Sequence, residues 1–137
     1  INTEYLAASL SDMDWHTISA EEDLKDANRF ESESMKKVGL IDEIAPRYRT
    51  TYFAHIFSGG YSSGYYSYVH AAVLDSDAFE AFKEAGDVFD PNLSSKLRAT
   101  IYSKGSTEEA MDLFVQFRGR KADIGPLLKV RGLDGSE

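Results

Sequence analysis

Apolar residues recur along most of the chain at the three- and four-residue steps of an α-helix. In the first stretch Leu6, Leu10 and Met13 lie on one face of a helix, which we predict to end at Trp15 and His16. The alternation of apolar and polar positions that marks a β-strand is weak throughout. The pattern therefore predicts an all-α fold, an irregular region of several helices.

A second helix is predicted from the capping-box spacing of Ser19 and Glu22, in which each side chain bonds a free backbone N–H of the first turn. Gly39 is suited to end this helix, because glycine readily adopts the left-handed conformation found after a helix. Between these limits the helix carries four apolar positions: Leu24, Ala27, Phe30 and Val38.

Residues 41–64 interrupt the helical pattern. Pro46 disfavours helix at the residue before it, and Gly59, Gly60 and Gly64 loosen the backbone further on. We predict one long loop here, rich in tyrosine and glycine. We find no internal repeat and no linker, so the chain reads as one domain over residues 1–137.

Helical spacing returns after this loop and is predicted to end near Gly86 at these positions: Val69, Ala72, Val73, Phe79 and Phe82. Asp90 followed by Pro91 predicts the next helix start, with an N-cap and a proline in the first turn. Gly105 ends the run of four-residue steps that follows: Leu93, Leu97 and Ile101.

The last predicted helix follows a second capping box, Ser106 with Glu109. Its apolar face consists of Ala110, Leu113, Phe114 and Phe117. An irregular end is predicted from the residues beyond it: Gly119, Gly125, Pro126 and Gly132.

Composition narrows the classes of function. The 15 basic and 23 acidic side chains give a formal net charge of -8, and an acidic protein repels phosphate backbones, so we expect no nucleic-acid partner. No stretch approaches the about 18 apolar residues needed to cross a bilayer, so we expect no membrane partner. Cysteine is absent, which excludes disulfides and thiolate metal sites. We expect a soluble protein, and the composition does not distinguish the cytoplasm from the periplasm.

The most distinctive segment is residues 47–68, which hold six of the eight tyrosines and one of the three histidines. Phenol groups offer hydrogen bonds on a rigid apolar ring, and glycine lets backbone approach a ligand closely. A plainer interpretation is also open. Tyr61, Tyr65 and Tyr68 have helical spacing and could form the edge of a core, and His55 could be structural.

Two runs in this segment, YFAHIFSGGY at 52–61 and GYYSY at 64–68, resemble the signature loop of the thimet-oligopeptidase family of zinc metallopeptidases. The sequence PRYR at 46–49 resembles its peptidyl-dipeptidase branch. The resemblance covers nearly the whole chain, since residues 4–16 and 127–133 are similar as well.

The chain departs from the family pattern at two positions. His70 and Ala122 stand where tryptophan and proline are expected. We interpret both as local changes of packing.

The resemblance implies the C-terminal part of the catalytic domain of a peptidase that releases dipeptides from peptide C-termini. The family holds its zinc with a His-Glu-x-x-His helix and a further Glu. The three histidines, His16, His55 and His70, lack that spacing. We expect zinc in the full-length parent, with ligands before Ile1, no cofactor and no metal ligand in this fragment, and no activity of the fragment alone.

The resemblance also implies catalytic roles. Tyr65 and Tyr68 would face the tetrahedral oxyanion, with Tyr68 the first candidate as its hydrogen-bond donor. His55 would contact the substrate backbone. The expected partners are an oligopeptide substrate and the remainder of the catalytic domain.

Substrate binding is implied for Tyr61 and for the mobile backbone at Gly59 and Gly60. Arg47 and Arg49 are candidates for the free C-terminal carboxylate of the peptide, because guanidinium binds carboxylate through two hydrogen bonds. Surface salt bridges explain these arginines equally well.

A different class of function remains open as well. The chain could be a non-catalytic helical module whose tyrosine loop binds a peptide or a protein.

Overall fold

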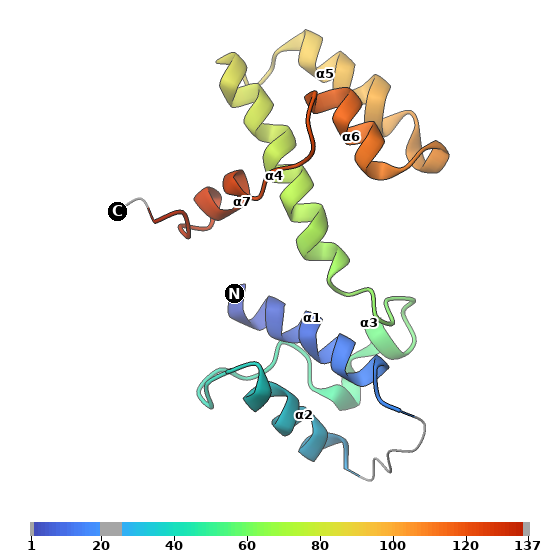
Figure 1. The fold of residues 1–137 in the computed structure, drawn as a ribbon, viewed down its shortest axis with the longest axis vertical. Helices are drawn as coiled ribbons and strands as arrows, with labels where there is room; N and C mark the ends of the chain where they lie inside the picture. Colours follow the sequence, from blue (N-terminus) through green and yellow to red (C-terminus); the bar gives the residue numbers. More distant parts are fainter. Residues whose placement is uncertain (1, 20–25, 136–137) are drawn as a thin grey trace. The chain divides into compact units, whose positions relative to one another are not determined.

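A computed structural model describes residues 2–19 and 26–135 of the chain. These residues form helices and no strand, which confirms the all-α class (Figure 1). They divide into two compact units, one ending at Val69 and the other beginning at His70. The boundary falls inside helix α4 (Ser67–Ala85) instead of in a linker, which explains why the sequence shows no break.

Helix α1 (Asn2–His16) ends where the sequence predicts, but its buried face differs from the predicted one. The side chains that predict that face are exposed: Leu6, Leu10 and Met13. The buried face carries Ala8 and Asp12 instead. The small side chain of Ala8 leaves room for the rings of Phe53 and Tyr65, which pack against it. Contacts made far along the chain therefore decide which face of α1 is buried.

Asp26 is the N-cap of helix α2 (Ala27–Lys37), and its carboxylate accepts hydrogen bonds from the N–H groups of Asn28 and Arg29. The predicted capping box cannot be compared, since Glu22 and also Leu24 lie outside the described residues. Gly39 has a φ of +77° and follows the helix as predicted.

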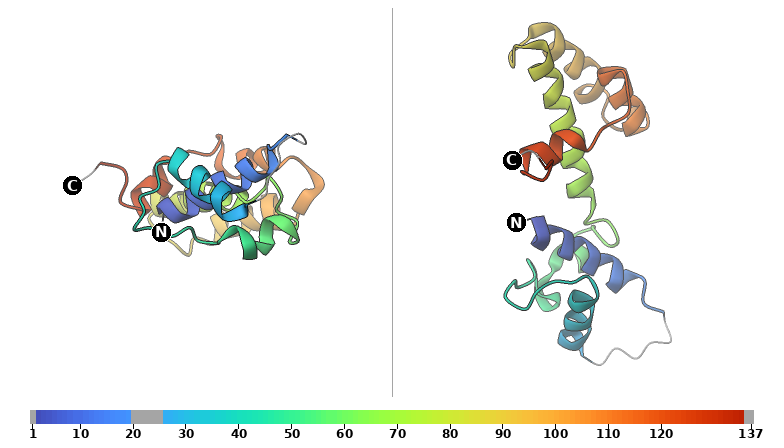
Figure 2. Two further views of the ribbon diagram at one scale, coloured as in Figure 1. Left: turned by 90° about the horizontal axis from the view of Figure 1, so that it is seen from below. Right: turned by 60° about the vertical axis from the view of Figure 1, so that its left-hand side comes forward.

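Helices α1 and α2 pack together within the first unit (Figures 1 and 2). The ring centroids of Trp15 and Phe30 lie 4.1 Å apart, and Trp15 Nε1 donates to Thr50 Oγ1 at 3.1 Å. The buried carboxylate of Glu31 accepts from the Thr50 N–H at 2.6 Å and pairs with Arg49. These contacts fix Arg49 and Thr50, which lie within the segment in which we predict one long loop.

That segment is more ordered than the sequence indicates, because it contains two short helices, the 3₁₀-helix η1 (Thr50–Tyr52) and α3 (Ala54–Phe57). Phe53 lies between them and Ile56 within the second, and both side chains are buried. Together with Tyr65 they form the core under the tyrosine- and glycine-rich turn.

In the second unit, α4 ends just before Gly86, as predicted. Helix α5 (Pro91–Leu97) has the predicted N-cap, since Asp90 accepts from the N–H groups of the first turn. It continues into one π-helical turn, η2 (Arg98–Tyr102). The unit's core consists of Ala81, Phe82 and Phe117, with Ala78, Leu93, Leu97 and Ile101 packed against it.

Two sequence predictions for the second unit are wrong. Helix α6 (Ala110–Arg118) starts after Glu109, whose side chain makes no capping hydrogen bond, and Ser106 lies in the separate 3₁₀ turn η3 (Gly105–Thr107). The end of the chain is not wholly irregular either, because Gly125 and Pro126 begin a short helix, α7 (Gly125–Val130). Proline at the start of a helix loses no hydrogen bond there.

Asp77 of α4 holds the second unit together through its fully buried carboxylate. It accepts hydrogen bonds from Arg118 Nε at 3.0 Å, from Arg120 at 2.6 Å and from the Asp123 N–H at 2.8 Å. Burial by itself raises the pKa of this carboxyl, but the hydrogen bonds from Arg120, Asp123 and Arg118 outweigh it and the pKa is lowered. The carboxylate therefore ties α4 to the end of α6 and to the segment before α7.

Replacing Asp77 with Asn should destabilise the chain by about 3 kcal/mol, because it removes the buried negative charge to which Arg118 and Arg120 donate. Since the folded-state pKa is lowered, this contribution is present above the unfolded-state value of about 3.9 and is lost as the pH falls through the folded-state value. Urea unfolding from acid to neutral pH measures both effects. Asp75→Asn, an exposed change on the same helix, is the control. Equal stability of the two variants at neutral pH would contradict this role of Asp77.

Candidate functional site

Seven aromatic side chains of the first unit gather around His55 and Tyr65. We call this group the tyrosine cluster: Tyr5, Tyr48, Phe53, His55, Tyr61, Tyr65 and Tyr68. It brings together all of the histidine and tyrosine positions that the sequence analysis singles out. Tilted and edge-on contacts between neighbouring rings, which dominate here, are favourable arrangements for aromatic side chains.

His55 lies in α3 and is half-buried. Its ring centroid is 6.0 Å from that of Tyr61, 5.7 Å from that of Tyr65 and 6.4 Å from that of Tyr68. The Tyr61 and Tyr68 rings are stacked, with centroids 5.1 Å apart. An imidazole and three phenols thus lie within reach of one another, and a single peptide could contact several of them.

The three tyrosines do not share a helix face, because only Tyr68 belongs to a helix, the first turn of α4. The edge-of-core part of the plainer interpretation holds, since Tyr65 lies in the core and Tyr68 packs against it. Tyr61 and Tyr65 belong to the turn before it. Tyr65 is only 2% exposed and packs against Phe53 at 5.1 Å between centroids. A folded turn, and not a helix face, therefore brings these side chains together.

Gly59 and Gly60 shape the turn that follows α3. A Cβ on Gly59 would lie 2.9 Å from His55 Cα and 3.1 Å from the Ala54 carbonyl oxygen, closer than backbone atoms allow. Gly60 has a φ of +80°, a conformation that favours glycine. The Tyr61 N–H then donates to the His55 carbonyl at 3.0 Å. The two glycines thus let the chain reverse tightly enough to return Tyr61 to His55.

The two candidate arginines have different surroundings. Arg47 extends over the cluster, its guanidinium carbon 5.2 Å from the Tyr5 ring centroid and 5.7 Å from that of Tyr48. Arg49 pairs with the buried Glu31. The structure therefore places Arg47 beside the predicted site residues and engages Arg49 in an ion pair.

The phenol groups of Tyr65 and Tyr68 favour their neutral, hydrogen-bond-donating form, because the pKa of each is raised. The hydrogen bond with Tyr61, and then burial, raise the pKa of Tyr68 to about 12. Burial first, and then its tyrosine neighbours, raise the pKa of Tyr65. A hydrogen bond with Tyr48 raises the pKa of Arg47. At neutral pH the site therefore offers uncharged hydroxyl donors beside one cation.

The sequence analysis does not assign four residues of the site: Tyr5, Asp12, Tyr48 and Phe53. Tyr5 of α1 lies 5.8 Å from Tyr65 between ring centroids, and Tyr48 lies 5.1 Å from His55. Asp12 contacts the backbone of the tyrosine turn. Spacing could not reveal Tyr5 and Asp12, because they approach the turn only when α1 packs against it.

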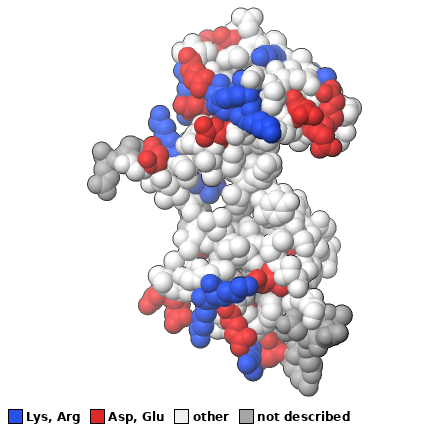
Figure 3. Space-filling view, in the orientation of Figure 1, with Lys and Arg blue, Asp and Glu red and all other residues white. Residues whose placement is uncertain are grey.

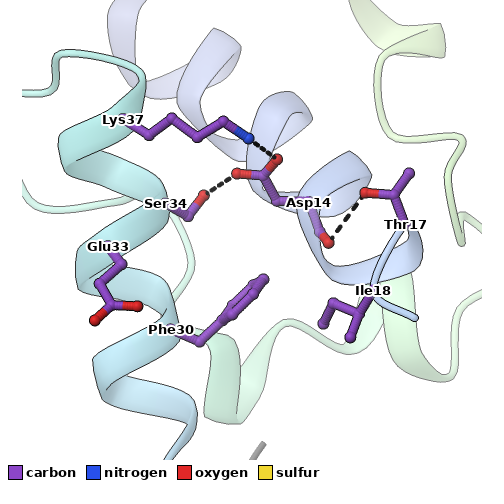
Figure 4. Close-up of a pocket in the computed structure, with 7 residues that line it drawn as sticks. All are labelled: Asp14, Thr17, Ile18, Phe30, Glu33, Ser34 and Lys37. Atoms are coloured by element: carbon purple, nitrogen blue, oxygen red, sulfur yellow. Dashed lines mark hydrogen bonds and ion pairs between the residues drawn. The ribbon is translucent and has the colours of Figure 1, made fainter. Parts of the chain in front are cut away.

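Pockets in the described part of the chain include the following three. One of about 270 Å³ lies between α1 and α2 and is shown in Figure 4, where Ser34 and Lys37 bond the carboxylate of Asp14. The second, of about 220 Å³, includes Arg49 in its lining. The third, of about 670 Å³, belongs to the second unit and is lined mainly by α4, η2 and α6. No residue of the tyrosine cluster lines these three pockets.

The described residues contain no group of three or more His, Asp or Glu side chains that could hold a metal ion. In Figure 3, basic atoms of each unit lie next to acidic ones. None of the described helices has both the length and the apolar character that crossing a membrane requires.

Comparison with known proteins identifies the family. The family model described as "Peptidase family M3" matches residues 2–133. The chain belongs to peptidase family M3, a family of zinc metallopeptidases. This confirms the resemblance carried by the tyrosine-rich turn.

Several curated relatives resemble this M3 chain. Dipeptidyl carboxypeptidase of Escherichia coli is 38% identical over 133 residues, 96% of this chain, and the enzyme of that name from Salmonella typhimurium is 36% identical over the same share. Oligopeptidase A of Escherichia coli is 46% identical over 83 residues, 61% of this chain. The chain spans 19% of the length of the two dipeptidyl carboxypeptidases and 12% of that of oligopeptidase A.

The geometry of the glycine turn predicts that alanine is destabilising at Gly59 and tolerated at Gly64. Gly59→Ala should destabilise the chain by about 1–3 kcal/mol, because the new Cβ meets backbone atoms that cannot move aside. Gly64→Ala is the matched control, since its Cβ would meet Tyr61 atoms no closer than 3.4 Å. We expect it to change stability by about 0.5 kcal/mol or less. Urea unfolding measures the stability of both variants. A Gly59→Ala variant as stable as the unsubstituted chain would show that the turn can relax.

Proposed function

We propose that the tyrosine cluster forms the substrate side of a peptidase active site that releases dipeptides from peptide C-termini. The observation that carries this proposal is the convergence of His55, Tyr61, Tyr65 and Tyr68 in a chain of peptidase family M3. The similarity to two proteins named dipeptidyl carboxypeptidase over 96% of the chain supports the type of product. In this proposal the chain is the C-terminal part of the family's catalytic domain.

The hydroxyl donors are suited to peptide hydrolysis. Attack on a peptide carbonyl creates a tetrahedral oxyanion, and fixed donors that point at it lower the barrier. Tyr68 is the principal donor in this proposal, with Tyr65 beside it. The raised pKa of Tyr68 keeps its proton available at neutral pH. The ring of Tyr61 is stacked on that of Tyr68, with centroids 5.1 Å apart.

Other residues of the cluster would hold the peptide. His55 and Tyr61 would bond its backbone, and the turn at Gly59 and Gly60 would let that backbone approach closely. Arg47 is the better candidate for the free C-terminal carboxylate, because Arg49 already has Glu31 as a partner.

The family's zinc does not fit the residues described, which include no suitable cluster of ligands. The proposal therefore assigns the zinc ligands to a part of the family domain outside these residues, and it expects the 137-residue chain to be inactive on its own.

A hybrid enzyme tests the proposal. In Escherichia coli dipeptidyl carboxypeptidase, the stretch that matches this chain is replaced by residues 2–133. We expect the hybrid to release dipeptides. Neither the Escherichia coli dipeptidyl carboxypeptidase with that stretch deleted nor the chain alone should release them. A folded hybrid that does not release dipeptides contradicts the proposal. If the chain alone nevertheless binds oligopeptides, that result favours a non-catalytic binding module.

In the hybrid, Tyr68→Phe should lower kcat by about 100- to 1000-fold with little change in KM, because the lost hydroxyl acts mainly on the transition state. Tyr66→Phe is the matched control. Tyr66 is 55% exposed and lies two residues away, outside the tyrosine cluster. Steady-state kinetics on both variants provide the measurement. A Tyr68→Phe hybrid with unchanged kcat would remove this hydroxyl from the mechanism.

A further inference from the structure

Asp12 is a carboxylate in the middle of α1 that is 0% exposed. Its Oδ1 accepts a hydrogen bond from the Ser63 N–H at 3.0 Å, and its Oδ2 accepts one from the Tyr65 N–H at 2.9 Å. The His16 ring nitrogen Nδ1 lies 2.9 Å from the same Oδ1. A buried carboxylate is unfavourable unless it is bonded in this way, and helix α1 itself does not need one at this position.

Both hydrogen bonds reach the turn that carries the tyrosines. The Gly64 N–H closes this turn on the Tyr61 carbonyl at 2.8 Å. Inside it Ser63 has a φ of +53°, an unfavourable conformation for a residue with a side chain. The carboxylate of Asp12 bonds the N–H of Ser63 and that of Tyr65, on either side of Gly64. It therefore stabilises the strained backbone between Tyr61 and Tyr65.

The effect extends to Tyr68. Its N–H donates to the Tyr65 carbonyl at 3.3 Å, and the two rings lie 5.1 Å apart between centroids. A shift of the Tyr65 backbone would therefore move the first turn of α4 and the Tyr68 hydroxyl with it. Small displacements of this kind are sufficient to impair catalysis.

We propose that Asp12 is a positioning residue of the peptidase site: by bonding the backbone N–H groups of Ser63 and Tyr65, it holds the Tyr68 hydroxyl where the oxyanion forms. This inference rests on the proposed function. Asp12 does not touch the substrate and acts only through the turn.

Asp12→Asn is the informative variant. Asparagine has the same shape but only one acceptor oxygen, and its NH₂ group faces one of the two N–H donors. The matched control is Asp14→Asn, also on α1, where the carboxylate bonds Ser34 and Lys37 of α2 and not the turn.

The first measurement uses the 137-residue chain and does not depend on activity. Amide hydrogen exchange followed by NMR should show protection at Ser63 and Tyr65 falling about tenfold or more in Asp12→Asn, with little change in Asp14→Asn. Protection within α2 reports whether the unit remains folded. Unchanged exchange at both amides, in a folded variant, would overturn the inference.

The second measurement uses the hybrid enzyme. Asp12→Asn should lower kcat by about 10- to 100-fold and change KM by about threefold or less, since the affected hydroxyl acts in the transition state. Asp14→Asn should behave like the unsubstituted hybrid. Normal kcat in the Asp12→Asn hybrid, together with faster exchange at the two amides, would show that Asp12 stabilises the turn without positioning catalysis.

A second substitution separates positioning from a general loss of stability. Ser63→Gly removes the steric penalty of the left-handed conformation, so in the Asp12→Asn hybrid it should restore kcat by about threefold or more. Loss of stability alone lowers the folded fraction but not the kcat of each folded enzyme, so kcat is expressed per folded hybrid. No gain in that kcat from Ser63→Gly would count against the inference. If the unsubstituted hybrid is inactive, the proposed function fails, while the exchange measurement still tests whether Asp12 holds the turn.

Discussion

The placement of Tyr65 is the constraint on which the first unit depends. Its N–H is bonded to the buried carboxylate of Asp12, and its ring packs against Phe53 in the core. Backbone and side chain are thus fixed by different partners, one polar and one apolar. Because both the backbone N–H and the ring of Tyr65 are fixed, the neighbouring rings of His55 and Tyr68 pack against a ring that does not move. The site is built outward from a residue that is itself almost inaccessible to solvent.

The two units use different interactions for the same purpose, which is to fix segments that have little regular structure. In the first unit aromatic packing and a buried carboxylate hold a glycine-rich turn. In the second, the carboxylate of Asp77 holds the connection between α6 and α7 through Arg118 and Arg120. In both cases a buried acid accepts backbone or guanidinium hydrogen bonds, which offset the free energy of removing its charge from water.

The expectations that failed share a cause. Leu6 and Leu10 predict the wrong buried face of α1, because periodicity identifies an apolar face but not the surface that covers it. Ser106 and Glu109 have capping-box spacing, yet α6 begins only after Glu109. Local patterns compete with the packing of distant segments, and where the two disagree the packing prevails. The caps that did form, at Asp90 and Gly39, need only their immediate neighbours.

The sequence by itself determined the helical class, the ends of α1, α2 and α4, the start of α5, and the family, because these depend on residue spacing and on a contiguous run of tyrosines and glycines. It also indicated His55, Tyr61, Tyr65 and Tyr68 as a group. Only the tertiary structure decided that Tyr5 and Asp12 of α1 join them and that Arg47, unlike Arg49, lies against their rings. The reason is physical: these contacts join residues some 40 to 60 positions apart, and they form only when α1 packs on the tyrosine turn.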